Sequence, residues 1–249
     1  MNVYTDIKGY TAHIVFSNPP VNALPSNVLD GLEIHLKSIG ERDDIKTVVL
    51  QSEGHTFCAG AAFDELIALN DFESAKAFFM GFGKVILAMR SVPKPVIVRV
   101  QGKTVGGGVG IVAAADLSVA TDKAAFKLSE LSIGIGPYVI APAIIRKTGT
   151  AFFQQMSLQP WQWFSAFDAR KAGLLTHITE SEGRMDEIID KMVSAYEKYD
   201  SKAMVSLKKE IWQDTDHWEQ LLEKQAEKSA SLLLRESTKK ILSEIKNRK

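Results

Sequence analysis

Cysteine is nearly absent from this sequence: Cys58 is the single cysteine among 249 residues. One cysteine excludes an intrachain disulfide and a zinc site built from cysteine thiolates. The five histidines show no His-x-x-x-His spacing, so a metal site has little support from them either. We therefore expect no metal and no separate cofactor.

An excess of charge of one sign is also lacking, because 30 basic residues balance 30 acidic ones. This balance excludes a general electrostatic attraction to nucleic acid or to an anionic membrane. No apolar run approaches the roughly 20 residues that span a bilayer, and no charged-then-apolar leader precedes the first strand-like segment. We expect a cytoplasmic protein without nucleic-acid or membrane partners. Its 45% apolar residues suffice for a large core.

Strand-like and helix-like segments alternate over the first 120 residues. Short apolar runs at 13–16, 47–50, 95–100 and 117–120 predict strands, and helical patterns follow Ser26, Phe63 and Ile111. Ser26 is the expected N-cap of the first helix. This alternation predicts an α/β fold with mostly parallel strands that carry turns at their carboxyl ends.

From about Ala151 onward the pattern becomes helical, and residues 214–249 contain no strand-like run. We expect two parts, a core over residues 1–190 and a helical C-terminal region over residues 191–249. That region is predicted to pack on the core or on a neighbouring subunit.

Two glycine-bearing turns each lie between a strand-like and a helix-like run. The first turn spans residues 57–62 (FCAGAA), and the second turn spans residues 102–108 (GKTVGGG). Each presents backbone N–H groups that secondary structure does not pair. Two such donors aimed at one point stabilise a developing oxyanion, as when a thioester carbonyl becomes an enolate.

These two turns, the Leu-Ser-Glu-Leu run at 128–131 and the segment 167–174 (FDARKAGL) closely resemble the crotonase (enoyl-CoA hydratase/isomerase) superfamily. The motifs occur in family order over roughly residues 5–180. The resemblance implies a ββα-superhelix core, a helical C-terminal region used in trimer contacts and acyl-CoA substrates. It also implies a homotrimer or a dimer of trimers.

Carried over by motif, the family's two oxyanion donors fall on the backbone N–H groups of Ala61 and Gly107. One of the two glutamates that family hydratases use matches Glu130, and the apolar residues around it favour a raised pKa and acid–base work. The other falls on Gly110, which has no side chain to act. The vacancy at Gly110 is the main departure from the family pattern.

The remaining candidates are expected to bind the CoA or acyl part of a substrate, largely through backbone. They are Phe57, Ala59, Gly60, Ala62, Gly106, Gly108, Gly110 and Tyr138. Many relatives have Asp where Ala62 stands. Asp64 and Glu65 are further polar candidates, Lys76, Lys84 or Lys103 are candidates for meeting a distal carboxylate on the acyl group, and Lys246 for a CoA phosphate.

The resemblance implies that a single glutamate catalyses the hydration of an enoyl-CoA. Within the family, the sequence most resembles the bacterial methylglutaconyl-CoA hydratases. Enoyl-CoA isomerisation is the second hypothesis, because one carboxylate suffices to move a proton between two carbons. A CoA-binding paralogue without catalysis is the third. Coenzyme A belongs to the substrate in each case.

Three other interpretations fail or are weak. Gly102-Lys103-Thr104 mimics the end of a P-loop, but Ile97 stands where its first glycine is required. The run at 108–113 (GVGIVA) matches a dinucleotide fingerprint, but the connector 103–105 separates it from the strand. Ser129 has no motif-supported His and Asp partners for a protease triad. Cys58 is interpreted as a small buried side chain.

Overall fold

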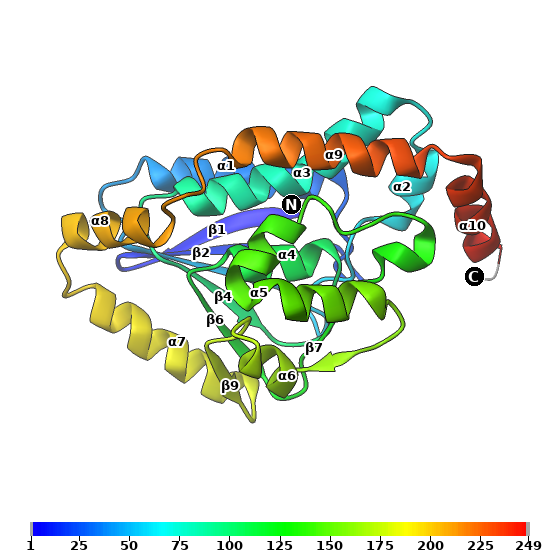
Figure 1. Cartoon of the computed structure of the whole chain (residues 1–249). Coiled ribbons are helices and arrows are strands. Elements are labelled where there is room, and N and C mark those ends of the chain that lie inside the picture. The colour runs from blue at the N-terminus through cyan, green and yellow to red at the C-terminus, as the bar shows by residue number, and fades with distance from the viewer. Residues whose placement is uncertain (1, 248–249) are drawn as a thin grey trace.

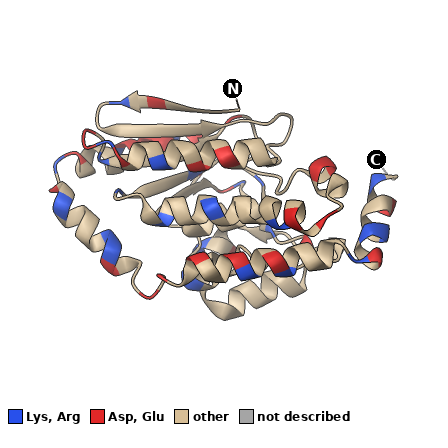
Figure 2. Cartoon of the chain, turned by 90° about the horizontal axis from the view of Figure 1, so that it is seen from above, with Lys and Arg blue, Asp and Glu red and all other residues tan. Residues whose placement is uncertain are grey.

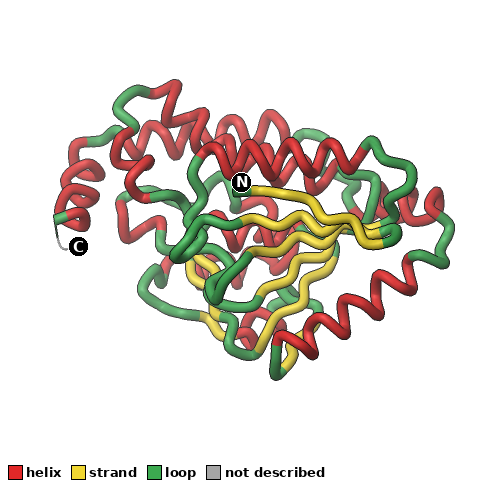
Figure 3. Tube along the Cα trace, turned by 180° about the vertical axis from the view of Figure 1, so that it is seen from behind, coloured by secondary structure: helices red, strands yellow, loops and turns green. Residues whose placement is uncertain are grey.

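A six-stranded sheet organises the molecule, for which a computed structural model describes residues 2–247. Its order is β1-β2-β3-β4-β6-β9, as seen from behind in Figure 3. β1 is antiparallel to β2, and every other neighbouring pair is parallel. The strands are β1 Val3–Lys8, β2 Thr11–Phe16, β3 Thr47–Ser52, β4 Val96–Val100, β6 Leu117–Thr121 and β9 His177–Thr179. The predicted α/β class and its parallel strands are confirmed.

A second, three-stranded sheet has the order β5-β7-β8, with β5 Thr104–Val105, β7 Ala125–Lys127 and β8 Phe164–Ser165. β5 is parallel to β7 in the register Val105↔Lys127. This short sheet holds the second turn and the segment that leads to Glu130.

Three helices lie side by side over one face of the large sheet (Figure 1). They are α1 Ser26–Gly40, α3 Phe72–Ser91 and α9 Trp218–Leu233. Their apolar residues join the main core, and α9 packs directly on α3 of the same chain. The C-terminal region therefore covers its own core.

Helix α7 (Glu182–Tyr196) covers the opposite face of the sheet and forms a smaller core there. Its apolar residues Met185, Ile189 and Val193 pack against strand residues Val49, Ile97 and Val119. The helix runs across residue 190, where the sequence analysis placed a boundary.

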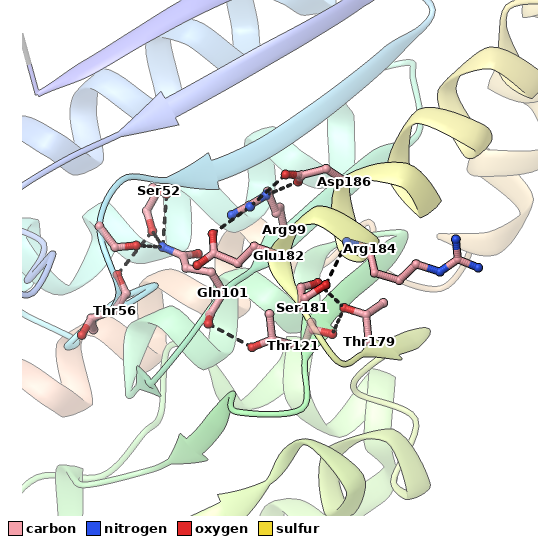
Figure 4. Close-up of polar contacts among 12 residues, drawn as sticks. Ser52, Thr56, Arg99, Gln101, Thr121, Thr179, Ser181, Glu182, Arg184 and Asp186 are labelled. Carbon is pink, nitrogen blue, oxygen red and sulfur yellow. Dashed lines mark hydrogen bonds and ion pairs between the residues drawn. The ribbon is translucent and has the colours of Figure 1, made fainter.

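Polar contacts fix α7 to the sheet (Figure 4). The Arg99 guanidinium on β4 donates to Asp186 at 2.6 Å and to Glu182 at 2.9 Å.

The ends of three strands are joined by a second set of bonds. Gln101 Nε2 donates to Ser52 Oγ at 3.0 Å, and Thr121 Oγ1 donates to the Gln101 carbonyl. These bonds set the carboxyl ends of three strands in register, and both turns leave the sheet there.

The remaining helices are α2 Phe63–Ala68, α4 Gly107–Ala114, α5 Ala141–Leu158, α6 Ala166–Lys171, α8 Ser201–Ile211 and α10 Glu236–Lys246, with a 3₁₀ turn at Glu130–Ile133. Basic and acidic residues are both spread over the helices (Figure 2), in keeping with the zero net charge. None of the helices within residues 2–247 combines the length and apolarity needed to cross a bilayer.

The predicted N-cap at Ser26 is wrong by one residue. Pro25 occupies the cap position, and α1 begins with Ser26 itself. The Ser26 hydroxyl and N–H both bind the Glu65 carboxylate of α2 instead. A carboxylate distant in sequence thus replaces a local cap.

Candidate active site

The first turn leads from β3 into α2 and leaves one backbone donor unpaired. Gly60 has φ 91°, a conformation that glycine adopts without strain. The Gly60 carbonyl accepts from Leu24 N–H at 2.8 Å, and Ala62 N–H donates to the Leu24 carbonyl at 3.1 Å. Between them, the Ala61 N–H has no acceptor within residues 2–247.

The second turn leads from β5 into α4. Gly106, with φ 53°, donates its N–H to the Lys127 carbonyl at 2.9 Å. Gly107 is the first residue of α4, and its N–H meets no acceptor in the part of the chain that the structure describes. The positive end of the helix dipole adds to the attraction of this donor for an anion.

Both turns line a single cavity of about 250 Å³. Residues from the turns, from 129–140, from α2 and α3 and from α9 form its wall. They are Ala59, Gly60, Ala61, Phe63, Leu66, Phe79, Phe82, Val105, Gly106, Gly107, Ser129, Glu130, Ile133, Ile135, Gly136, Pro137, Tyr138, Val139, Ile140 and Ser229. Ala61 and Gly107, which carry the two unpaired N–H groups, therefore line the same cavity.

Glu130 is the one acidic or basic side chain in the described wall of this cavity. Its Oε2 is inaccessible to solvent and has no hydrogen-bond partner within the described residues. Its Oε1 lies against the second turn, because a β-carbon added to Gly106 would be 2.8 Å from it. The carboxyl group therefore lies next to the residue that precedes the Gly107 donor.

Burial raises the pKa of Glu130 to about 7, although its own N–H and that of Ser129 oppose the rise. A carboxyl group with a pKa near 7 both accepts and returns a proton at neutral pH. The arrangement thus combines two unpaired backbone N–H groups with one carboxyl group of raised pKa in a mostly apolar cavity.

The second carboxylate position has no room for a side chain. A β-carbon on Gly110 would lie 2.4 Å from Ile140 Cγ2 and 2.6 Å from Ile140 Cβ. Gly110 itself does not line the cavity, whereas Ile140 does. The vacancy expected from the sequence is thus filled by an apolar side chain.

Comparison with known proteins decides the family. The model of the enoyl-CoA hydratase/isomerase family matches residues 6–242. The chain belongs to the enoyl-CoA hydratase/isomerase family.

Two curated members illustrate the sequence relationship. A "Probable enoyl-CoA hydratase" of Bacillus subtilis is 27% identical over 199 residues, which cover 80% of this chain and 76% of the relative. A "Short-chain-enoyl-CoA hydratase" of Clostridium acetobutylicum is 29% identical over 199 residues, with 78% and 76% covered. A solved enoyl-CoA hydratase of Bacillus halodurans superposes with a TM-score of 0.92 at 20% identity, over 98% of this chain and all of the other, and so shares the fold.

Within this family, the residues predicted from motifs divide into two groups. Ala59, Gly60, Ala61, Gly106, Gly107, Glu130 and Tyr138 all line the cavity. Phe57, Ala62, Gly108 and Gly110 do not. Phe57 is fully buried and packs edge-to-face on Phe16 at 5.5 Å, so it supports the first turn from behind.

The other polar candidates do not reach the cavity. Glu65 binds Ser26, and Asp64 is exposed on the first turn of α2. Among the lysines, Lys76 pairs with two glutamates, Glu223 and Glu227, each at 2.8 Å. Lys103 lies over the Trp163 ring at 5.3 Å. Lys84 and Lys246 are exposed and absent from the wall.

Sequence motifs missed the part of the cavity wall that helices α3 and α9 supply. Phe79 and Phe82 come from α3, and Ser229 comes from α9, more than a hundred residues later. The helical spacing of phenylalanines at 78, 79 and 82 marks a buried face. That spacing does not distinguish packing in the core from lining a cavity.

The last helix supports the segment that carries Glu130. Thr238 Oγ1 donates to the Gly134 carbonyl at 3.2 Å, and Gly134 ends the 3₁₀ turn that begins at Glu130. On the other side, Lys239 Nζ donates to the Leu69 carbonyl at the end of α2. Helix α10 thus ties the glutamate segment to the helix that follows the first turn.

Proposed function

We propose that this protein is an enoyl-CoA hydratase that works with a single glutamate. The observation that carries the proposal is the Glu130 carboxyl group, whose Oε2 is buried and has no partner within the described residues, in a cavity that Ala61 and Gly107 also line. The names of the two curated hydratases support the same reaction class.

In the proposed mechanism, the thioester carbonyl oxygen of an enoyl-CoA accepts hydrogen bonds from Ala61 and Gly107. The Glu130 carboxylate takes a proton from water as the water oxygen bonds to C3 and the π electrons move toward the carbonyl oxygen. The resulting enolate then takes the proton from Glu130 at C2. One water is added, and Glu130 returns to its ionised form.

The filled space at Gly110 favours a second candidate, enoyl-CoA isomerisation. Without a second carboxylate, a water molecule has fewer groups to orient it. Removal of a C2 proton by Glu130 and its return at C4 needs no water, and the same two N–H groups hold the dienolate. A non-catalytic CoA-binding paralogue is less well supported, because a carboxyl oxygen that is buried without a partner among the described residues is costly to keep without a use.

The apolar wall favours an uncharged acyl group. Its described residues include no lysine, arginine or histidine, so a distal carboxylate would be desolvated without a counter-ion. The likeness to methylglutaconyl-CoA hydratases, whose substrate carries such a carboxylate, stays a prediction. So does the homotrimer or dimer of trimers.

Three thioesters separate these proposals: crotonyl-CoA, 3-hexenoyl-CoA and 3-methylglutaconyl-CoA. We expect loss of the conjugated-thioester absorbance with crotonyl-CoA and formation of 3-hydroxybutyryl-CoA. We expect kcat/KM for 3-methylglutaconyl-CoA to be at least about tenfold lower, because of the missing counter-ion. Conversion of 3-hexenoyl-CoA to its conjugated isomer, with crotonyl-CoA unreacted, would instead identify an isomerase. Binding of all three without turnover would identify the non-catalytic paralogue.

A further inference from the structure

The two turns that carry the proposed oxyanion donors are in contact through the backbone and the side chain of Cys58. Cys58 lies in the first turn and is completely buried. Its backbone forms a parallel bridge with the second turn. In this bridge the Cys58 N–H donates to the Lys103 carbonyl at 3.2 Å, and the Val105 N–H donates to the Cys58 carbonyl at 2.8 Å. These backbone bonds set the register of the two segments.

The sulfur atom adds a contact beyond this bridge. Cys58 Sγ accepts the Gly60 N–H at 3.3 Å, and the Gly108 backbone packs against the same sulfur. Gly60 immediately precedes the Ala61 donor, and Gly108 immediately follows the Gly107 donor. The sulfur therefore contacts the neighbour of each proposed oxyanion donor.

The approach of the second turn to Cys58 is close. A β-carbon on Gly108 would lie 2.6 Å from Cys58 Cβ and 2.8 Å from its Sγ. Only glycine at 108 allows this distance without a shift of the turn. The Cys58 side chain thus fills the space between the two turns, in addition to the backbone bridge that joins them.

We propose that Cys58 is a positioning residue for the reaction: its side chain accepts the Gly60 N–H, packs against Gly108 and thereby helps to set the separation of the Ala61 and Gly107 N–H groups. The inference rests on the proposed function, because it assumes that these two donors bind a thioester oxygen. It assigns no bond-making step to the sulfur. Burial raises the pKa of the Cys58 thiol to about 12, which keeps it protonated and unsuited to attack a thioester.

The test compares Cys58→Ala, Cys58→Ser and the control Val98→Ala. Cys58→Ala removes the acceptor but leaves the backbone bridge, and Cys58→Ser keeps an acceptor on a shorter bond. Val98 is fully buried in β4 and does not line the cavity, so its truncation costs packing energy without touching the turns. All rates are measured well below the lowest melting temperature.

We expect Cys58→Ala to lower kcat about tenfold or more with KM within about threefold of wild type, since small misplacements of catalytic groups reduce rate strongly. Cys58→Ser should fall between Cys58→Ala and wild type, and Val98→Ala should keep its kcat. A second readout is the red shift of a chromophoric cinnamoyl-CoA thioester on binding, which reports polarisation of its carbonyl. That shift should shrink in Cys58→Ala and persist in Val98→Ala.

Two outcomes are kept apart by the wild-type protein. If wild type binds the cinnamoyl thioester without a red shift, the proposed oxyanion site itself fails. If wild type gives the shift and Cys58→Ala gives the same shift and kcat, the positioning role is wrong. A kcat loss in Val98→Ala equal to that in Cys58→Ala would also overturn it. If Cys58→Ala does not fold, Cys58→Ser decides: a reduced kcat and red shift support the role, whereas wild-type values of both contradict it, because the shorter side-chain bond would then have moved the acceptor without effect.

Discussion

Replacing Glu130 by glutamine is expected to lower kcat about 1,000-fold while acyl-CoA binding stays within a few-fold of wild type. The amide is nearly isosteric with the carboxyl group but accepts no proton, so acid–base catalysis is lost. No other acidic or basic side chain of the described wall is available to replace it. Steady-state rates with crotonyl-CoA and titration with a non-reactive acyl-CoA measure the two quantities.

The same variant is expected to gain stability relative to wild type as pH rises. The pKa of Glu130 is about 7 in the folded protein, above the ordinary value of 4.5, so the folded state binds the proton more tightly than the unfolded state. Wild type therefore loses stability between about pH 4.5 and pH 7, by roughly 3 kcal/mol in all. Glu130→Gln has no such loss, and denaturant unfolding at pH 5 and pH 8 measures the difference.

Asp64→Asn is the matched control, since Asp64 is an exposed acid on the helix that follows the first turn. It should change neither the rate nor the pH dependence of stability by more than a small factor. A Glu130→Gln protein with more than a tenth of wild-type activity would contradict the assigned role.

The second large effect is expected from Gly107→Ala, which should lower kcat at least about 100-fold. A β-carbon at this position would lie 2.1 Å from Cε1 of the Phe82 ring. The ring is buried and packs edge-to-face on Phe78 at 6.1 Å, so it cannot withdraw without disturbing the core. The start of α4 must shift instead, and the Gly107 N–H moves with it. Loss of one oxyanion donor lowers kcat by roughly 100-fold or more.

Gly183→Ala provides the matched control, because no atom of the described residues, apart from neighbouring residues of α7 itself, lies within 4 Å of a β-carbon at Gly183. The double variant Gly107→Ala with Phe82→Leu relieves the collision and should recover part of the lost kcat. Circular dichroism checks that each variant is folded. A folded Gly107→Ala protein with kcat within threefold of wild type is the result that contradicts this account.

Motifs that resemble the crotonase superfamily were enough to predict the chemical half of the site. Ala61, Gly107 and Glu130 were carried over from those motifs, and the structure brings all three to one cavity. Such motifs carry over because a turn's backbone conformation depends on a few adjacent residues. The roles of these residues stay predictions until activity is measured.

The other half depends on contacts that no local pattern encodes. Ile140 fills the space beside Gly110, and Ser229 reaches the cavity from α9. Both follow from how distant helices pack, as does the Ser26–Glu65 contact that replaced the expected cap. A vacancy in a motif therefore indicates which side chain is missing, and only the packed structure indicates what occupies its place.

The most direct test of the central claim is exchange of the C2 protons of butyryl-CoA in D₂O, followed by NMR. This saturated thioester has no double bond to hydrate or isomerise, so exchange requires only an enolate held at the carbonyl oxygen and a base at C2. We predict that wild type exchanges a C2 proton and that Glu130→Gln does so at least about 100-fold more slowly. No exchange by wild type, or equal exchange by both proteins, would contradict an enolate held by Ala61 and Gly107 opposite Glu130.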